Sequence, residues 1–526
     1  MISQKYQKER FSLKNKLTKV FWLSLILVSI TVSFALLFPN IFLNTTNEIR
    51  EIIGTNLGWY YLLLVTLIVF LCLFLIFSPI GQIRLGDPDS KPEHSKISWL
   101  AMLFSAGMGI GLIFWGAAEP LSHYAISTPS MNAETDFALA EAFKYTFFHW
   151  GIHAWSIYGI VGLALAYFKF RKKEKSLISV TLKPLFGNKT DGIVGTTIDS
   201  ITIFSTVIGV ATTLGFGAIQ INGGLTYLFD IPKNIYVQMI IIAITTALFI
   251  ASALSGIGKG VKILSNINLI LAVGLCAIAI LIGPTTLILN TFVNSLGNYL
   301  QDFIQMSFST APFNITQHNW IEKWTLLYWA WWLSWSPFVG VFIARISKGR
   351  TIREFLINVL LIPSLFSFLW FTVFGSMSTN IQSSGIDLRI FSVEETLFAT
   401  FNYYNFGAFL SIIALILIFS FFITSADSAT FVLGMLSEDG TLNPKNKTKV
   451  TWGMLVSLIS IVLLIAGGLD ALQNVLIIIA LPFSVVILLL MISLFIELNH
   501  EKKQMGLYIK PDTYPDKDEP FKSYEN

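Results

Sequence analysis

Long apolar runs separated by short polar segments dominate this chain of 526 residues. An α-helix of roughly 20 apolar residues crosses a hydrocarbon core about 30 Å thick. By that measure, the pattern predicts twelve membrane-spanning helices, near 20–38, 57–77, 98–120, 142–168, 193–220, 235–253, 263–283, 322–344, 354–377, 406–436, 450–466 and 472–496. We therefore expect an all-α integral membrane protein.

Composition supports the same class. Hydrophobic residues make up 54% of the chain, charged residues 13%, and the mean hydropathy is +0.68. Soluble globular domains are about a quarter charged. These values argue against a cytosolic enzyme, a nucleic-acid binder and a secreted scaffold. The two cysteines, Cys72 and Cys276, both lie in apolar runs, so no disulfide framework organises the chain.

The basic residues fall mostly on one side of the predicted membrane. With a cytoplasmic N-terminus and alternating helices, 30 of the 35 Lys and Arg lie on the cytoplasmic side, and the outer loops hold only Arg50, Lys233 and Arg389. An excess of Lys and Arg is typical of cytoplasmic loops. The distribution therefore predicts twelve helices with both termini in the cytoplasm.

Two spans carry residues that interrupt helices. The third contains Gly107, Gly109 and Gly111, and the eighth contains Pro337. A GxxxG spacing often means only close helix packing. The two spans are five helices apart, however, which divides the chain into two leading helices and two five-helix halves of opposite orientation. Such inverted repeats are typical of secondary transporters, which bind substrate beside discontinuous helices.

This division predicts six regions. They are a basic cytoplasmic N-tail at 1–19, two leading helices at 20–77, a first repeat at 98–283, an outer segment at 285–320, a second repeat at 322–496 and a cytoplasmic C-tail at 497–526. The outer segment has apolar residues at three- and four-residue intervals, which favours an amphipathic surface helix. A packed extracellular loop is the alternative.

Aromatic residues gather in the fourth and eighth spans. Trp150, Trp155 and Tyr158 share one face of a continuous helix, and Trp332 and Trp335 immediately precede Pro337. Packing alone is the alternative. Several indole faces together attract a quaternary ammonium ion, at about 0.5 to 2 kcal/mol per ring. Neither motif offers a carboxylate that would salt-bridge a primary amine. We therefore expect a trimethylammonium zwitterion, whose own carboxylate the backbone amides of the interrupted third span would meet.

Polar residues at membrane depth are candidates for an ion site. Thr206 lies in the fifth span, and Thr424 and Ser425 lie in the tenth. Such hydroxyls often bond back to the helix, but hydroxyl and carbonyl oxygens also suit a hard cation such as sodium. His149 and His153 lack a nearby carboxylate in the sequence, which favours a structural role. No catalytic pattern is present, so we do not expect an enzyme.

The chain resembles the betaine/choline/carnitine transporter family, and most of all its glycine betaine carriers. The resemblance extends from about residue 15 to 500. The segments that carry it are 106–124 (AGMGIGLIFWGAAEPLSHY), 149–158 (HWGIHAWSIY), 328–353 (YWAWWLSWSPFVGVFIARISKGRTIR) and 421–428 (FFITSADS).

The resemblance implies a twelve-helix 2 + (5 + 5) carrier of the LeuT-like type. It also implies a homotrimer in a bacterial cell membrane that imports glycine betaine with sodium for osmoprotection. The substrate site would comprise Trp150, Trp155, Tyr158, Trp332 and Trp335, with the glycines of the third span, Gly107, Gly109 and Gly111. One sodium site would use the backbone of Ser105 and Met108, the carbonyl of Phe421 and the hydroxyls of Thr424 and Ser425; a second would use Thr206 and Phe338.

Two positions refine this expectation. Val210 stands where sodium-coupled members have a second threonine, which leaves the second sodium site and the stoichiometry open. Gly111 stands where choline carriers tend to have aspartate, which favours a zwitterion. Transport or exchange of carnitine, ectoine, choline or proline betaine, or an osmotically gated channel, remain alternatives. The basic N-tail could also contact anionic lipid.

Overall fold

The computed structural model describes residues 17–107, 109–129, 132–254 and 258–506. Within these ranges the chain is helical, with one isolated β-bridge between Arg84 and Thr351 and no β-strand. The all-α prediction is therefore confirmed for the described part of the chain.

The helices of the first half of the chain are α2 (Lys19–Leu37), α3 (Pro39–Phe77), α4 (Lys96–Gly107), α5 (Ile110–Trp115), α6 (Ala118–Leu121), α7 (Asp136–Trp150), α8 (Ile152–Ala166), α9 (Lys183–Phe186), α10 (Ile193–Phe229), α11 (Ile235–Leu254) and α12 (Gly258–Ile282). The helices of the second half are α13 (Thr285–Gln301), α14 (Phe303–Phe308), α15 (Ile315–Lys323), α16 (Thr325–Ile346), α17 (Ile352–Ser383), α18 (Thr396–Asn402), α19 (Gly407–Ser437) and α20 (Asn446–Gln504).

Ten helical segments of the described chain are long and apolar enough to cross a membrane. The predicted spans 450–466 and 472–496 both lie in α20, which contains non-helical backbone at Gly467 and Gly468. The predicted span 98–120 is divided among α4, α5 and α6, each of them short. These two features account for the difference between ten segments and the twelve predicted spans.

The interruption of the third span is confirmed. Helix α4 ends at Gly107, and α5 begins at Ile110 after the extended residue Gly109. Side chains of α17 bind carbonyls that the broken helix leaves free: Trp370 Nε1 donates to Leu112 O at 2.8 Å, and Ser378 Oγ donates to Ala117 O at 3.0 Å. Unwound backbone at membrane depth needs such partners because lipid offers none.

The predicted interruption of the eighth span is wrong. Helix α16 continues through Pro337, although proline removes the hydrogen bond to the carbonyl four residues earlier. That carbonyl belongs to Leu333, and it accepts a hydrogen bond from Ser336 Oγ at 2.7 Å. The neighbouring hydroxyl thus replaces the missing amide, and the helix remains intact.

The fourth span contains a break that the hydrophobic pattern does not predict. Helix α7 ends at Trp150, Gly151 has non-helical backbone (φ −96°, ψ −139°), and α8 begins at Ile152. A Cβ at Gly151 would lie 2.5 Å from Phe147 O and 2.6 Å from the Phe368 ring, so only glycine fits. The single continuous face expected for Trp150 and Trp155 therefore does not exist.

Three predicted boundaries also differ. Helix α3 begins at Pro39, so residues 39–56, expected as an outer loop, are helical. The segment 285–320 forms α13, α14 and most of α15. Helix α20 continues to Gln504, so the predicted C-tail begins inside a helix, where Glu501 binds Arg171. Residues 1–16 and 507–526 of the predicted tails lie outside the described residues.

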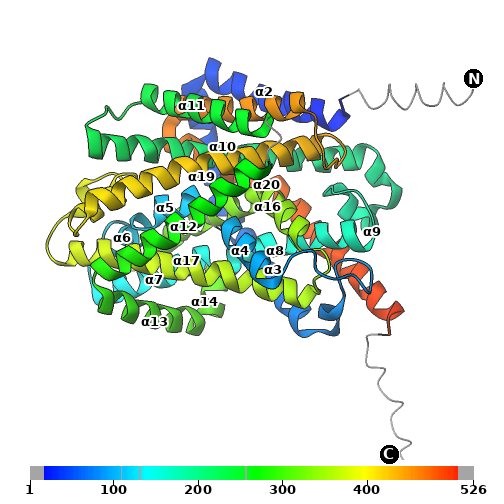
Figure 1. Ribbon diagram of the computed structural model, residues 1–526, viewed down its shortest axis with the longest axis horizontal. Coiled ribbons are helices and arrows are strands. Elements are labelled where there is room, and N and C mark those ends of the chain that lie inside the picture. The colour runs from blue at the N-terminus through cyan, green and yellow to red at the C-terminus, as the bar shows by residue number, and fades with distance from the viewer. Residues whose placement is uncertain (1–16, 108, 130–131, 255–257, 507–526) are drawn as a thin grey trace, which may run out of the picture.

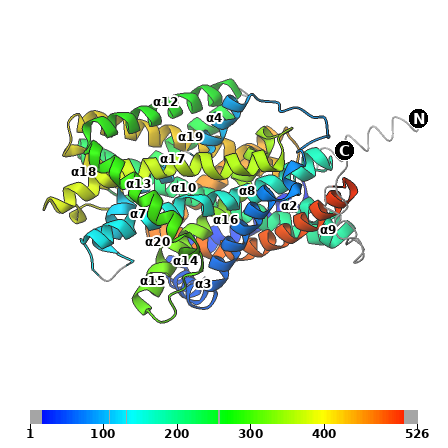
Figure 2. The ribbon, with the colours of Figure 1, turned by 90° about the horizontal axis from the view of Figure 1, so that it is seen from below.

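The long helices run along the longest axis of the molecule (Figures 1 and 2). Helix α2 begins, and α20 ends, at the side of the molecule where α9 lies, whereas α6 and α18 lie at the other side. Helices α8, α10 and α16 form the buried centre, and α11 and α12 are more exposed. The chain thus surrounds a core built from α8, α10, α16 and the broken third span.

Candidate functional site

A cavity lies among α5, α8, α10 and α16, beside the break between α4 and α5. The space not filled by atoms there is about 520 Å³, a volume that includes the part open to the surroundings. Its lining is mostly aromatic: Trp150, Trp155, Tyr158, Trp331, Trp332 and Trp335. The remaining lining residues are Gly109, Ile110, Gly111, Leu112, Ala154, Thr213, Val339 and Ser367. All five aromatic residues predicted for the substrate site therefore meet at one cavity.

Protein acceptors hold the N–H groups of three indoles that come from α16. Trp332 Nε1 donates to His149 O at 2.9 Å, Trp331 Nε1 to Thr213 Oγ1 at 3.1 Å, and Trp335 Nε1 to Gly209 O at 2.8 Å. Since these polar edges are occupied, the rings are left to present apolar and π surfaces to the cavity. Such surfaces suit a cation that makes no hydrogen bonds.

The rings also fix one another. The centroids of Trp150 and Trp332 are 4.9 Å apart in a T-shaped arrangement, and Trp331 stacks on Trp332 at 5.1 Å. Gly111 makes this close approach possible, because a Cβ there would lie 2.9 Å from Trp331 and 3.0 Å from Trp150. Of the three predicted glycines, Gly109 and Gly111 line the cavity; the surroundings of Gly107 lie outside what the structure describes.

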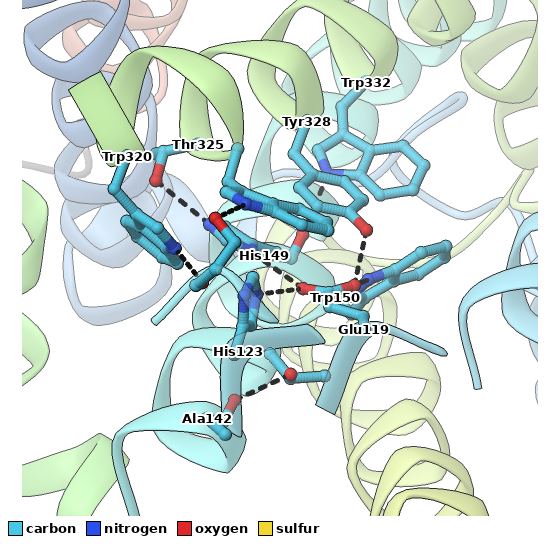
Figure 3. A network of polar contacts seen from close by, with 12 residues as sticks. Glu119, His123, Ala142, His149, Trp150, Trp320, Thr325, Tyr328 and Trp332 are labelled. Carbon is cyan, nitrogen blue, oxygen red and sulfur yellow. Dashed lines mark hydrogen bonds and ion pairs between the residues drawn. The ribbon is translucent and has the colours of Figure 1, made fainter. Parts of the chain in front are cut away.

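A buried carboxylate, that of Glu119, lies behind Trp150, one of the rings that line the cavity (Figure 3). Glu119 Oε2 accepts hydrogen bonds from Trp150 Nε1 at 2.7 Å and from the hydroxyl of Tyr328 at 2.5 Å. Glu119 Oε1 contacts His149 Nδ1 at 2.8 Å and His123 Nε2 at 3.2 Å. Glu119 comes from α6, and its partners come from the adjacent π-helical turn Ser122–Ile126, from α7 and from α16.

The two histidines of the fourth span differ in their surroundings. His149 contacts Glu119 and, through Nε2, Thr325 Oγ1 at 3.0 Å, so the prediction that it lacks a carboxylate is wrong. His153 contacts Ser307 Oγ at 2.8 Å and stacks on Trp329. The ligand atoms of Glu119, His123 and His149 lie within 4.8 Å of one another, a spacing at which they could also hold a metal ion.

The predicted first sodium site can be described only on the α19 side. The hydroxyl of Thr424 is buried and donates within its own helix, to Ser420 O at 3.1 Å or Phe421 O at 3.3 Å. It accepts from Asn268 Nδ2 at 3.5 Å. Ser425 is half-buried. Met108 lies outside the described residues, as does the side chain of Ser105. The structure therefore describes the surroundings of the Thr424 hydroxyl and does not test the rest of this predicted site.

The second predicted sodium site has fewer oxygen atoms. Thr206 is buried and its hydroxyl donates to Thr202 O at 2.7 Å, the i−4 bond expected of threonine in a membrane helix. Val210, one turn later, is buried and offers no oxygen. Phe338 packs edge-on against Trp335 at 5.3 Å.

Sequence reasoning missed several residues of the site. Trp331 lies next to Trp332, and Thr213 lies two turns after Thr206 in α10, so a search for all polar-edged side chains in the helices of the predicted site would have included both. Glu119 and Tyr328 carried a weaker signal, the Glu-Pro pair at 119–120 and the aromatic run before Trp329. Glu119 meets Trp150, Tyr328 and His149 only through the fold, at separations of 30 residues or more.

A helical membrane protein with a buried aromatic cavity beside a broken helix has the construction of a carrier for small organic solutes. A model of the betaine/carnitine/choline family transporters matches residues 19–503. The chain belongs to this family, and it is therefore a multi-pass membrane transporter and not an enzyme.

Three bacterial relatives illustrate the similarity. The chain is 53% identical to the glycine betaine transporter OpuD of Bacillus subtilis, over 93% of this chain and 96% of the relative. It is 42% identical to an ectoine/hydroxyectoine transporter of Virgibacillus pantothenticus, over 90% and 95%. It is 38% identical to a glycine betaine transporter of Acinetobacter baylyi, over 94% and 75%.

Proposed function

We propose that this protein imports glycine betaine across the cell membrane by sodium symport, for osmoprotection. The observation that carries the proposal is the cavity in which Trp150, Trp155, Tyr158, Trp332 and Trp335 meet beside the break at Gly109. A trimethylammonium group has no N–H to donate, so aromatic surfaces are its natural partners. The name of the Bacillus subtilis relative supports the same substrate.

The carboxylate of betaine needs a different partner. Helix α5 begins at Ile110, between the cavity-lining residues Gly109 and Gly111. Amide groups at a helix N-terminus have no helical acceptor and favour an anion. A zwitterion would thus place its cation among the rings and its anion at the start of α5.

Sodium would be held by the hydroxyls of Thr424 and Ser425, the carbonyl of Phe421 and the backbone of Ser105 and Met108. The buried hydroxyl of Thr424 and its proximity to Phe421 O support this site. Thr206 and Phe338 would contribute to a second site, for which the apolar Val210 supplies no ligand. We therefore favour coupling through the Thr424 site.

The membrane arrangement that we propose has twelve crossings. The broken third span counts as one, and α20 counts as two separated at Gly467 and Gly468. Two leading helices would precede two inverted five-helix repeats, with both termini in the cytoplasm. The common side of the start of α2 and the end of α20 supports this arrangement. A homotrimer, with anionic lipid at the basic N-tail, completes the proposal.

Uptake of labelled betaine into proteoliposomes tests the coupling. With an inward sodium gradient we expect accumulation above the external concentration, and replacement of sodium by potassium should abolish it. Thr424→Val should raise the sodium concentration for half-maximal uptake roughly tenfold or more, and Thr206→Val should raise it less. Undiminished uptake in potassium would exclude symport, and equilibration without accumulation would indicate a channel.

Ectoine or hydroxyectoine is the second candidate substrate, because a 42% identical relative carries that name. A competition panel of unlabelled betaine, carnitine, choline, proline betaine and ectoine against labelled betaine uptake separates the candidates. We expect betaine to compete best, since Gly111 leaves no anion for choline to pair with inside the cavity. Stronger competition by ectoine would reassign the preferred substrate.

A further inference from the structure

The polar network behind the aromatic cavity centres on one side chain, Glu119. Its side chain is completely buried. Its two oxygens face four hydrogen-bonding groups, namely the indole of Trp150, the phenol of Tyr328 and the imidazoles of His123 and His149 (Figure 3). An ionised carboxylate offers only acceptors, which is what an indole N–H and three further donors require.

With both imidazoles neutral, the network carries a net negative charge next to the cavity. Each imidazole needs only one N–H to reach Glu119, so both rings complete their contacts in the neutral form. His149 then accepts at Nε2 from the hydroxyl of Thr325, 3.0 Å away. His123 Nδ1 has no hydrogen-bond partner among the described residues. With neutral rings, the charge of Glu119 is not cancelled within the network.

This charge reaches the cavity through an aromatic ring. Trp150 lines the cavity and donates its N–H to Glu119 Oε2 at 2.7 Å. A hydrogen bond to an anion shifts electron density from the N–H into the ring, since linked hydrogen bonds polarise one another. A more negative ring face attracts a cation more strongly. Glu119 itself is absent from the lining residues.

We propose that Glu119 is a positioning residue that also supplies charge: its buried carboxylate fixes the plane of Trp150 and strengthens the attraction of that ring for a quaternary ammonium group. The carboxylate is covered by its donors and by the indole, so it offers no acceptor to a primary amine. The negative potential of the carboxylate would then extend into the cavity without a salt bridge to the substrate. This arrangement selects alkylated ammonium ions over protonated amines. This inference rests on the proposed function.

Glu119→Gln removes the negative charge but keeps the size and shape of the side chain, because the hydrogen-bond network can rearrange around an amide. The amide oxygen can accept from Trp150 and Tyr328, and the amide NH₂ can donate to both imidazoles after each ring moves its proton to the other nitrogen. His149 Nε2 would then donate to Thr325 Oγ1, its present partner. The hydrogen bonds to position 119 persist without the charge, while the moved proton of His123 lies on Nδ1, which has no acceptor among the described residues. Glu119→Asp is the complement, since it keeps the charge but shortens the side chain.

The test measures betaine Kd by tryptophan fluorescence, together with Tm, on the purified full-length protein. For Glu119→Gln we expect Kd to rise at least tenfold, about 1.4 kcal/mol, and Tm to fall modestly because the N–H on His123 Nδ1 is buried without an acceptor among the described residues. Glu119→Asp should weaken binding less than Glu119→Gln. Asp199→Asn is the matched control: Asp199 is another buried carboxylate, bound to Ser179 and absent from the cavity lining, so Kd should stay at the wild-type value.

The outcomes are distinct. Wild-type affinity in Glu119→Gln, or weaker binding in Glu119→Asp than in Glu119→Gln, overturns the charge role while leaving the proposed function in place. A wild-type protein that binds no betaine overturns both. If Glu119→Gln does not fold, Glu119→Asp decides: a rise in Kd below about tenfold supports the inference, and any larger rise contradicts it.

Discussion

Trp332 contacts three other aromatic side chains of the cavity lining. Its ring contacts Trp150 at 4.9 Å, Tyr158 at 6.0 Å and Trp331 at 5.1 Å, and its N–H binds His149 O. Tryptophan is costly at this depth unless its N–H has a partner, and here the fold supplies one. The residue therefore combines a packing role with a surface suited to a cation.

We expect Trp332→Leu to weaken betaine binding roughly tenfold or more, because one cation–π partner is worth about 0.5 to 2 kcal/mol and His149 O loses its donor. Binding is measured by equilibrium dialysis on purified protein, with Tm as the check on folding. Trp22→Leu is the matched control, since Trp22 is 52% exposed on α2. Equal affinity in both variants would mean that the cluster serves packing alone.

Gly111 and Gly109 allow a second prediction at this scale. A Cβ at Gly111 would lie within about 3 Å of two indole rings, whereas a Cβ at Gly109 meets nothing within 4 Å. Gly111→Ala should therefore displace Trp150 or Trp331 and reduce betaine affinity several-fold or more, while Gly109→Ala has a smaller effect. The KM for betaine uptake is compared between the two variants. A larger rise in KM for Gly109→Ala than for Gly111→Ala would contradict the role of Gly111 in the close approach of the rings.

Individual elements show why one predicted break exists and the other does not. Helix α4 ends at Gly107 and α5 begins at Ile110, and α17 supplies donors to the carbonyls of the broken span. Pro337 removes only one amide, and Ser336 replaces it locally. Whether proline or glycine interrupts a membrane helix thus depends on where the freed carbonyls find donors.

The Ser336 hydrogen bond makes a quantitative prediction. Ser336→Ala should destabilise the protein by about 1 to 3 kcal/mol, because it leaves the buried carbonyl of Leu333 without a donor. The double variant Ser336→Ala, Pro337→Ala should recover most of this loss, since an alanine in place of Pro337 provides the amide that proline lacks. Denaturant unfolding in detergent gives both values. Equal stability of the single and double variants would show that Ser336 does not replace the amide.

At the scale of the whole molecule, the positions of the helix ends distinguish two opposite sides. The start of α2 and the end of α20 share one side with α9. On that side Glu501, which is buried, binds Arg171 and Lys172 and accepts from the Tyr167 hydroxyl. This contact joins the end of α20 to the segment that follows α8, and so connects the two halves of the chain.

Cysteine labelling tests the proposed orientation. A membrane-impermeant maleimide added to intact cells should label Lys233→Cys and Arg389→Cys, and should label Lys175→Cys and Lys348→Cys only after permeabilisation. All four native side chains are partly exposed or exposed, and the native Cys72 and Cys276 are buried, so background labelling should be low. Labelling of Lys175→Cys in intact cells would contradict the cytoplasmic assignment.

The sequence by itself determined the helical membrane class, the break in the third span and the identity of most cavity aromatics, because lipid solvation and helix geometry act on local patterns. Only the tertiary structure decided that α16 continues through Pro337, that α7 and α8 separate at Gly151, and that Glu119 stands behind Trp150. Those outcomes depend on donors, acceptors and ring positions contributed by distant segments. The pattern of residues within one segment does not show which other segments it will contact.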